Sequence, residues 1–382
     1  MKRFISFLLV VILAFSMLCV PANAIGYATK STNSYEHDIL IGAVKWGLHF
    51  FSPINLNESH IHGTVKKEAV SFLTDNSPFA HASTILKMKN GSFICAWFSG
   101  AEEGAMDTRI WYSIKKPNGS WGKPVQLQDG INYSHWNPVL YLTKEGNVRL
   151  YYKSNGSCKD WIGYYCESRD CGKTWSAPQV INFESDTGLT AGGPVKNKCL
   201  RTSRGLLLAP NSYETNEVRR AVIEYSTDDG ATWHDSGEIR AYSDSGEEVM
   251  IIQPTLWESK DGSVHALLRS KDYFIYRTDS YDGGMTWCPA YRTGLLNNNS
   301  GIDLVKSDDG YLWLVCNPAF SVRSPLTLYV SKDDGNTWLS VMDIEKFLPI
   351  EFSYPSIIAD GRTLYITYTN MRMGINCLTI RY

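Results

Sequence analysis

The sequence has little charge imbalance and, beyond its first residues, no long apolar stretch. Its 37 Lys and Arg residues nearly balance its 39 Asp and Glu residues, so the net charge is only −2. This balance argues against nucleic acid or an anionic membrane surface as the main partner. No run after residue 24 approaches the roughly 20 apolar residues that a membrane span needs. We therefore expect no nucleic acid partner and no membrane insertion.

The sequence also lacks paired cysteines of the C-x-x-C kind. Its nine cysteines are scattered, and no ligand spacing indicates a zinc site, so we expect no catalytic metal and no cofactor. A calcium ion bound for stability is compatible with the sequence. Cys158, Cys166 and Cys171 are close enough in sequence for one local disulfide, and burial as free thiols is the alternative. The sequence alone predicts no particular pairing.

The first 24 residues are typical of a secretory signal peptide. Lys2 and Arg3 precede an apolar run over residues 4–15, and residues 22–24 read Ala-Asn-Ala, which matches an A-x-A cleavage site. A lipoprotein attached through Cys19 is the alternative, but Leu18 before this cysteine is a poor match to such sites. We expect a secreted or extracytoplasmic protein whose mature chain starts near Ile25 and carries a net charge of −4, because two cations leave with the signal.

An eight-residue motif, S-x-D-x-G-x-T-W, occurs four times without a gap, and a degraded fifth copy spans residues 113–121. The motif suits a tight hairpin: the Asp can accept backbone N–H groups, the Gly permits a positive φ, and the Trp packs between sheets. We call it the Asp box and assign it a structural, non-catalytic role. The copies are 51 to 58 residues apart, about the length of one four-stranded propeller blade, and they start at Ser113, Ser168, Ser226, Ser280 and Ser331.

A second repeat consists of two apolar strands joined by a polar turn, and it has six members. Six hairpins predict an all-β fold, a six-bladed β-propeller with Asp-box turns. We expect three segments: a signal peptide over 1–24, a leader or cap over 25–65, and the propeller over 66–382, as a monomer. A strand over 68–73 would complete the last sheet and close the ring. The hairpins span His81–Phe98, His135–Lys153, Val195–Asn211, Gln253–Arg269, Gly301–Asn317 and Tyr354–Thr369.

Polar residues gather at the open ends of these hairpins, which meet at one rim because both ends of an antiparallel hairpin lie together. Converging polar groups at one end of such a fold predict a ligand site, although solvated strand ends are the alternative for any single residue. The strand starts contribute His81, His135, Lys198, Gln253, Asn299 and Tyr354, and the strand ends contribute Lys153, Asn211, Arg269 and Asn317, with Arg323 shortly after.

A loop in the first blade, residues 98–111, mixes acids, glycines and a cation, as a loop over the mouth of a site would. Glu102, Glu103, Asp107 and Arg109 are its candidate site residues. An internal pairing between Asp107 and Arg109 that only shapes the loop is equally compatible with the sequence.

With the Asp boxes and hairpins in place, residues 66–382 resemble the sialidase (neuraminidase) superfamily. Members of this family hold a substrate carboxylate with three arginines, and by motif position two of them are Arg269 and Arg323. The family's nucleophilic tyrosine resembles Tyr354, in Phe-Ser-Tyr-Pro. The resemblance implies an acidic sugar as the ligand, since guanidinium groups bind carboxylates with parallel charge-assisted hydrogen bonds.

The sequence departs from the family at four other positions. His81 replaces the first arginine, Gln253 replaces the glutamate that activates the tyrosine, and Thr369 replaces a glutamate that steadies an arginine. No aspartate takes the place of the usual general acid near Ser99. The supports that retaining sialidase chemistry needs are therefore missing where the resemblance would place them.

Three functions remain compatible with this pattern. The favoured one is an exo-acting lyase for a terminal uronate, similar to known propeller lyases, in which His81 or His135 acts with Tyr354 as base and acid. A divergent exo-sialidase or other glycosidase that uses Glu102, Glu103 or Asp107 as a displaced acid is the second. A non-catalytic glycan-binding propeller is the third. All three predict an acidic glycan or oligosaccharide as partner.

Overall fold

The computed structural model describes residues 55–56, 64–72, 79–184, 192–215 and 218–382. The predicted signal peptide and most of the predicted leader lie outside these residues. The described residues form strands and loops without a helix, so they contain no helix that could cross a membrane.

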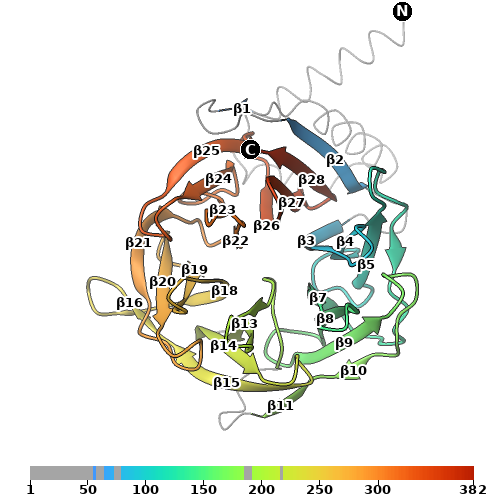
Figure 1. Cartoon of the computed structure of the whole chain (residues 1–382), viewed down its shortest axis with the longest axis horizontal. Coiled ribbons are helices and arrows are strands. Elements are labelled where there is room, and N and C mark those ends of the chain that lie inside the picture. Colours follow the sequence, from blue (N-terminus) through green and yellow to red (C-terminus); the bar gives the residue numbers. More distant parts are fainter. Residues whose placement is uncertain (1–54, 57–63, 73–78, 185–191, 216–217) are drawn as a thin grey trace, which may run out of the picture.

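Six sheets of the described chain surround a central axis (Figure 1), and all their strand pairs are antiparallel except β11 with β15. The predicted all-β, six-bladed propeller is confirmed. From the centre outward, the first sheet contains β3 (Phe79–Lys87), β4 (Phe93–Gly100), β5 (Arg109–Lys115) and β6 (Val125–Gln126). The second contains β7 (His135–Leu142), β8 (Val148–Ser154), β9 (Ile162–Ser168) and β10 (Gln179–Val180). The third contains β12 (Leu200–Arg201), β13 (Leu207–Glu214), β14 (Arg219–Ser226), β15 (Thr232–Ile239) and β11 (Asn182–Glu184).

The other three sheets follow the same plan around the ring. The fourth contains β18 (Ile251–Glu258), β19 (Val264–Ser270), β20 (Phe274–Ser280) and β21 (Tyr291–Leu296). The fifth contains β22 (Asp303–Lys306), β23 (Leu312–Cys316), β24 (Leu326–Ser331), β25 (Leu339–Glu345) and β1 (Asn55–Leu56). The sixth contains β26 (Phe352–Asp360), β27 (Thr363–Asn370), β28 (Gly374–Arg381) and β2 (Val65–Phe72). A short hairpin of β16 (Ala241–Tyr242) and β17 (Glu248–Val249) projects outward between the third and fourth blades.

The strand β2 closes the ring. It pairs antiparallel with β28 as the outer strand of the sixth blade, from Val65 opposite Ile380 to Phe72 opposite Gly374. The sixth blade therefore combines one strand that precedes the first blade in sequence with three strands that follow the fifth. This agrees with the strand expected over residues 68–73, of which Leu73 lies outside the described residues.

The core lies between the blades rather than in one central mass. Each pair of neighbouring blades encloses its own cluster of buried apolar side chains. Because a blade is covered on both faces, its inner strands are apolar almost throughout; β4, for example, is buried along all eight residues. The eight cysteines of the described chain are free thiols within this framework.

The Asp boxes form the expected turns. In the second blade, Asp170 accepts hydrogen bonds from Thr174 N at 2.9 Å and Thr174 Oγ1 at 2.7 Å, and Gly172 N donates to Ser168 Oγ at 2.8 Å. These donors lower the pKa of Asp170 to about 2. The acid is thus used to hold its own turn, which confirms the structural interpretation.

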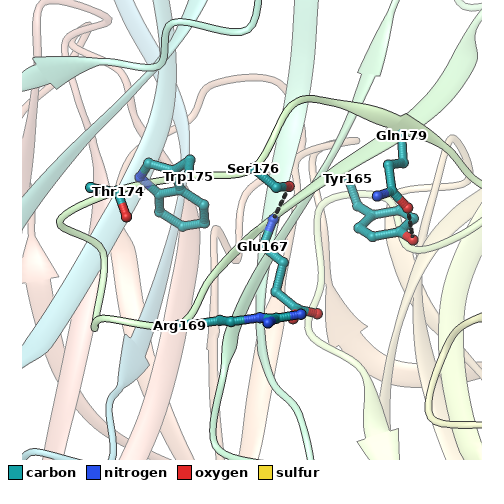
Figure 2. Close-up of a pocket in the computed structure, with 7 residues that line it drawn as sticks. All are labelled: Tyr165, Glu167, Arg169, Thr174, Trp175, Ser176 and Gln179. Carbon is teal, nitrogen blue, oxygen red and sulfur yellow. Dashed lines mark hydrogen bonds and ion pairs between the residues drawn. The ribbon is translucent and has the colours of Figure 1, made fainter.

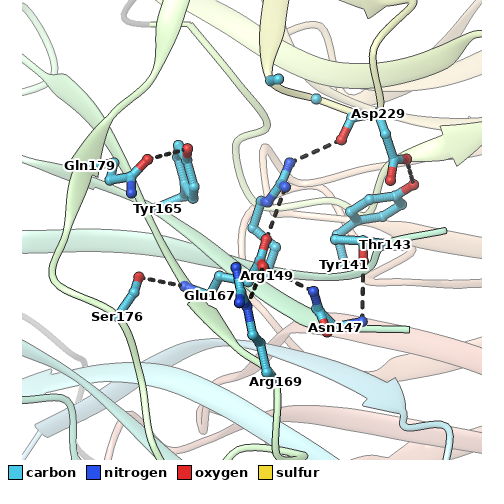
Figure 3. A network of polar contacts seen from close by, with 12 residues as sticks. Tyr141, Thr143, Asn147, Arg149, Tyr165, Glu167, Arg169, Ser176, Gln179 and Asp229 are labelled. Carbon is cyan, nitrogen blue, oxygen red and sulfur yellow. Dashed lines mark hydrogen bonds and ion pairs between the residues drawn. The ribbon is translucent and has the colours of Figure 1, made fainter. Parts of the chain in front are cut away.

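The Asp box also fastens one blade to the blade before it. Asp229, in the box of the third blade, accepts a 2.5 Å hydrogen bond from Tyr141 Oη, and its carbonyl accepts a 2.9 Å bond from Arg149 Nη1. Arg149 reaches in the other direction to Glu167 at 3.0 Å, as Figure 3 shows. This network ties the outer parts of the second and third blades together.

Candidate functional site

The innermost strands share a backbone distortion near their starts. Five residues have φ between 44° and 65°, in the left-handed region that residues other than glycine rarely adopt: Ala82, Asn137, Lys196, Gln253 and Tyr354. The pairing register shifts at the same places in β3, β7, β18 and β26. Bulges of this kind re-aim side chains and are common beside functional sites. Five blades therefore carry a left-handed residue near the centre, in addition to those at the outer turns, such as Cys171, Asp229 and Asp334.

Tyr354 lies at the middle of a cluster drawn from distant parts of the sequence. Its Oη accepts a 2.6 Å hydrogen bond from Arg269 Nη1, and the same nitrogen donates to Gln253 Oε1 at 3.1 Å. Arg269 Nε donates to Asn299 Oδ1 at 2.9 Å. The Cζ atoms of Arg269 and Arg323 are 5.6 and 5.3 Å from the centroid of the Tyr354 ring. Five residues predicted from hairpin ends and from the loop that follows the fifth hairpin are therefore brought together.

His81 packs against Tyr354 with ring centroids 4.1 Å apart. Its Nδ1 lies 2.9 Å from Thr369 Oγ1, and its Nε2 is buried with no hydrogen-bond partner among the described residues. Thr369 Oγ1 also accepts from Ala82 N at 3.2 Å, and because a hydroxyl can both accept and donate, these contacts fit either tautomer of His81; the tautomer with its proton on Nδ1 has Nε2 as an acceptor. Burial, followed by the charges of Arg372, Arg323 and other cations, holds the pKa of His81 well below its ordinary value of 6.5. His81 is therefore a neutral imidazole at neutral pH.

A chain of alternating charges borders Tyr354 on the sixth blade. Arg323 Nη1 and Arg372 Nε donate to the two oxygens of Glu351, at 2.8 and 2.9 Å. Arg372 Nη1 also donates to Glu103 on the first-blade loop. Burial raises the pKa of Glu351, but Arg323 and Arg372 more than offset it and lower the pKa below its ordinary value. Glu351 thus fixes the position of Arg323. At the position where the resemblance places a glutamate that holds an arginine, this chain has Thr369.

Neither Glu351 nor Arg372 was among the residues predicted from the sequence. Both lie outside the hairpin ends: Glu351 precedes β26, and Arg372 is in the turn between β27 and β28. Their sequence signal was weak, because it consists of an acid three residues before Tyr354 and a cation in a three-residue turn.

His135 is held within its own blade. Its Nε2 lies 2.6 Å from Asp129 Oδ2 and its Nδ1 lies 2.7 Å from the Tyr133 carbonyl oxygen, while its ring stacks on Tyr152 at 5.1 Å. Tyr152 Oη donates to the same Asp129 oxygen at 2.6 Å. Both nitrogens of His135 are therefore occupied, which differs from His81.

Two predicted residues are used to hold the third blade. Lys153 Nζ donates to the carbonyl oxygens of Gly192 and, at 3.0 Å, Gly193, and burial lowers the pKa of Lys153 to about 8. Asn211 Nδ2 donates to the buried Glu224 at 2.5 Å.

Lys198 and Asn317 likewise serve the interior. Lys198 Nζ forms a 2.6 Å ion pair with Asp303. Asn317 Nδ2 donates to the carbonyl oxygens of Pro325 and Phe352, each at 2.8 Å. These side chains support the site from the neighbouring blades.

Asp107 and Arg109 each bond to the backbone of the first-blade loop. Asp107 accepts from Ala101 N at 3.1 Å, and Arg109 Nη1 donates to the carbonyl oxygens of Met106 and Thr108 at 2.8 Å. The salt bridges of the described residues include no pair between them. Both residues therefore shape the loop, but through hydrogen bonds to its backbone and not through the pairing with each other that the sequence had suggested.

Two further ionisable groups near the cluster were not predicted. Lys196 Nζ donates to the carbonyl oxygens of Ile302 and Pro355 at 2.7 and 2.6 Å, so it joins three blades, and burial lowers its pKa to about 7. Glu214 ends β13, and burial raises its pKa although Arg219 and Arg269 lower it. Glu214 is thus a carboxyl that retains its proton more readily than usual.

A separate pocket of about 510 Å³ lies on the outer edge of the second blade, far from this cluster in the fold (Figure 2). Its polar groups pair with one another: Tyr165 Oη donates to Gln179 Oε1 at 2.5 Å, and Ser176 Oγ accepts from Glu167 N at 3.0 Å. Within the described residues, no group of three His, Cys, Asp or Glu side chains could hold a metal ion.

A six-bladed propeller with Asp-box turns and a polar centre is the class of protein that this fold and site define. The chain belongs to the BNR repeat-like domain family, whose model matches residues 91–366.

Solved structures give the same fold at low sequence identity. The microbial sialidase Hz136 from the Hadza is 18% identical, with a TM-score of 0.68 over 82% of this chain and 68% of that one. A protein of unknown function from Dyadobacter fermentans is 16% identical, with a TM-score of 0.65 over 83% of this chain and 99% of that one. A mutant of the NanB sialidase from Streptococcus pneumoniae is 12% identical, with a TM-score of 0.62 over 81% and 70%. The propeller is therefore one that sialidases also have.

Proposed function

We propose that this protein is a secreted, exo-acting enzyme that cleaves a glycan beside an acidic sugar near the end of the chain, and that it does so by β-elimination. The observation that carries the proposal is the grouping of Arg269, Arg323, Tyr354 and an unpartnered, neutral His81 nitrogen. Sialidases among the solved structures with this fold support a carbohydrate substrate. Two arginines beside one tyrosine support a carboxylate on that sugar.

The composition of the cluster favours elimination over double displacement. A nucleophilic tyrosine needs a carboxylate partner, and the residue beside Tyr354 at that position is the amide Gln253. Elimination needs instead cations on the sugar carboxylate, a base and an acid. Arginines that neutralise the carboxylate stabilise the negative charge that forms on it when the neighbouring proton leaves.

The reaction would act on a uronate that carries another sugar on O4. His81 Nε2 accepts the proton from C5, and the electron pair of that C–H bond forms the C4=C5 double bond. The bond from C4 to the glycosidic oxygen breaks, and Tyr354 Oη donates its proton to this oxygen. The products are an unsaturated uronate and a sugar with a free hydroxyl; a proton then returns from His81 to Tyr354. Because Nε2 is buried, side chains above it must shift when the sugar enters.

His135 has no part in this proposal, because both of its nitrogens already have partners. Lys153, Lys198, Asn211 and Asn317 support the site from behind.

Hydrolysis is the second candidate, and Glu214 favours it. A carboxyl with a raised pKa in the field of Arg269 is suited to donate a proton to a leaving oxygen. The three loop acids predicted for this role have other surroundings: Glu103 binds Arg372, Asp107 binds Ala101 N, and Glu102 is exposed.

The two reactions give different products from defined substrates. The protein is incubated separately with oligosaccharides in which the terminal sugar is linked to O4 of a glucuronate and with sialylated oligosaccharides. Ultraviolet absorbance from an unsaturated uronate supports the lyase. Release of intact sialic acid overturns elimination and supports hydrolysis through Glu214. Binding of either glycan without turnover would support a glycan-binding propeller and overturn both enzymes.

A further inference from the structure

Arg372 occupies a backbone position that normally excludes arginine. Met371 and Arg372 both have φ of 55°, and Met373 N donates to Asn370 O at 3.0 Å. Two left-handed central residues define the tight hairpin turn in which Asn and Gly are favoured, since larger side chains are strained there. The turn therefore gives an arginine no local advantage, and what it does offer is a fixed position for the side chain.

The turn is fixed against its neighbours, so the side chain has a defined starting point. Arg372 O accepts a 2.8 Å hydrogen bond from Ala80 N of β3, and Met371 N donates to Glu351 O at 2.8 Å. Arg372 is therefore placed between the sixth and first blades, at the side of the cluster where His81 replaces the family's first arginine. Its charge is also the largest of those that lower the pKa of His81.

The guanidinium of Arg372 is paired on one edge and partly open on the other. Nε is fixed by Glu351, which also fixes Arg323, so the two guanidinium groups are held side by side. Nη1 meets Glu103, and the side chains of Arg372 and Glu103 are 29% and 37% exposed. The partners of Arg269 are neutral oxygens, on Asn299, Gln253 and Tyr354. Only two carboxylates, Glu351 and Glu103, therefore accept hydrogen bonds within this cluster of three guanidinium groups, and the five side chains together carry a net positive charge.

We propose that Arg372 is the third cation of the acidic-sugar site, and that Glu103 holds its Nη1 until the carboxylate of the sugar replaces it. The inference rests on the proposed function and extends it to a residue outside the family's motif positions. It also gives the first-blade loop a role in selectivity: an acidic sugar can compete with Glu103 for Arg372, whereas a neutral sugar cannot.

Equilibrium binding separates this inference from catalysis. Glucuronate and N-acetylneuraminate are the probes and glucose is the neutral control, measured by calorimetry on the full chain. Arg372→Gln should weaken binding of the preferred acid by about 10- to 100-fold, as expected for loss of a charge-assisted pair. Arg372→Lys should recover only part of this loss, because lysine lacks the planar fork. Glu103→Gln should tighten binding by about 3- to 10-fold.

Glu102→Gln is the matched control, since it removes the same charge from the adjacent exposed residue. It should leave binding unchanged. Thermal unfolding of each variant shows whether the fold is intact, and Glu103→Gln tests the inference even where Arg372→Gln fails to fold.

The outcomes divide between the two proposals. If the wild type binds or cleaves acidic sugars but none of the Arg372 and Glu103 variants changes affinity, the inference is overturned while the proposed function stands. The same holds if Glu103→Gln weakens binding, because the ion pair would then only support the loop. If the wild type neither binds nor cleaves any acidic sugar, both are overturned.

Discussion

Polar side chains bond within their own turn at the outer edge of this propeller, whereas at its centre they bond to residues of other blades. At the outer turns, each Asp-box carboxylate is satisfied by donors of its own turn, and the arrangement repeats from blade to blade. At the centre, each blade contributes a different residue, and the contacts join residues far apart in sequence. Periodic polar residues therefore hold the fold, while aperiodic ones at equivalent places form the site.

The largest difference between the two regions should come from tyrosine hydroxyls. Tyr354→Phe removes the proposed proton donor and should lower kcat by roughly 1000-fold. Tyr165→Phe removes a hydroxyl at the outer edge and should leave kcat unchanged. Steady-state turnover of a 4-O-substituted glucuronate oligosaccharide measures both. Equal effects of the two changes would contradict a catalytic centre.

A smaller difference is expected for arginines. Arg269→Met should raise KM for an acidic substrate by about 10- to 100-fold, because it removes a charge-assisted contact to the carboxylate. Arg149→Met, in the network of the second and third blades (Figure 3), should leave KM unchanged and lower the midpoint of thermal unfolding instead. An unchanged KM in Arg269→Met would remove this residue from the substrate site.

The pH dependence of activity tests whether His81 is the base, and the expected change in activity is modest. The neutral imidazole is the base, so activity is lost as pH falls through its pKa, which lies below 6.5. Since the burial and the neighbouring cations that lower this pKa are present in the free enzyme, kcat/KM at pH 6 should be within about twofold of its value at pH 7.5. A pH profile of kcat/KM checks this. An acidic inflection at or above pH 6.5 would show that another group, or a solvated His81, is titrating.

The smallest effect on activity should come from the Asp box itself. Asp282 accepts from Thr286 N at 3.0 Å and Thr286 Oγ1 at 2.6 Å, which lower its pKa to about 2. Asp282→Ala should reduce the free energy of unfolding by about 1 to 2 kcal/mol, similar to loss of a helix cap, and leave kcat unchanged. Denaturant unfolding measures it. The contribution of this carboxylate is present above its unfolded pKa and is lost as pH falls toward 2, so the variant and wild type should converge in acid. A lowered kcat would contradict the assignment of the Asp boxes to stability and of the centre to activity.

The same contrast explains what could be predicted from the sequence. The Asp boxes and hairpins recur, so they gave the blade number and the shared rim. Arg269, Gln253 and Tyr354 meet because they lie at equivalent ends of different hairpins. Arg372 was missed because it occupies a turn position where its residue type is unfavourable.

His135 shows the opposite difficulty. It has the same hairpin position as His81, but Asp129 and Tyr133 precede it on a connection that follows no repeat. Whether a histidine nitrogen is free depends on such connections, and their paths are determined by tertiary packing rather than by local sequence.

The pairing of β2 with β28 also determines how the molecule should open. The described residues form six separate apolar clusters rather than one, so the blades could come apart one at a time. The shared sheet ties β2 to the C-terminal strand β28, so the backbone amides of β2 that donate to β28 should exchange with solvent more slowly than the outer-strand amides that face away from their sheets.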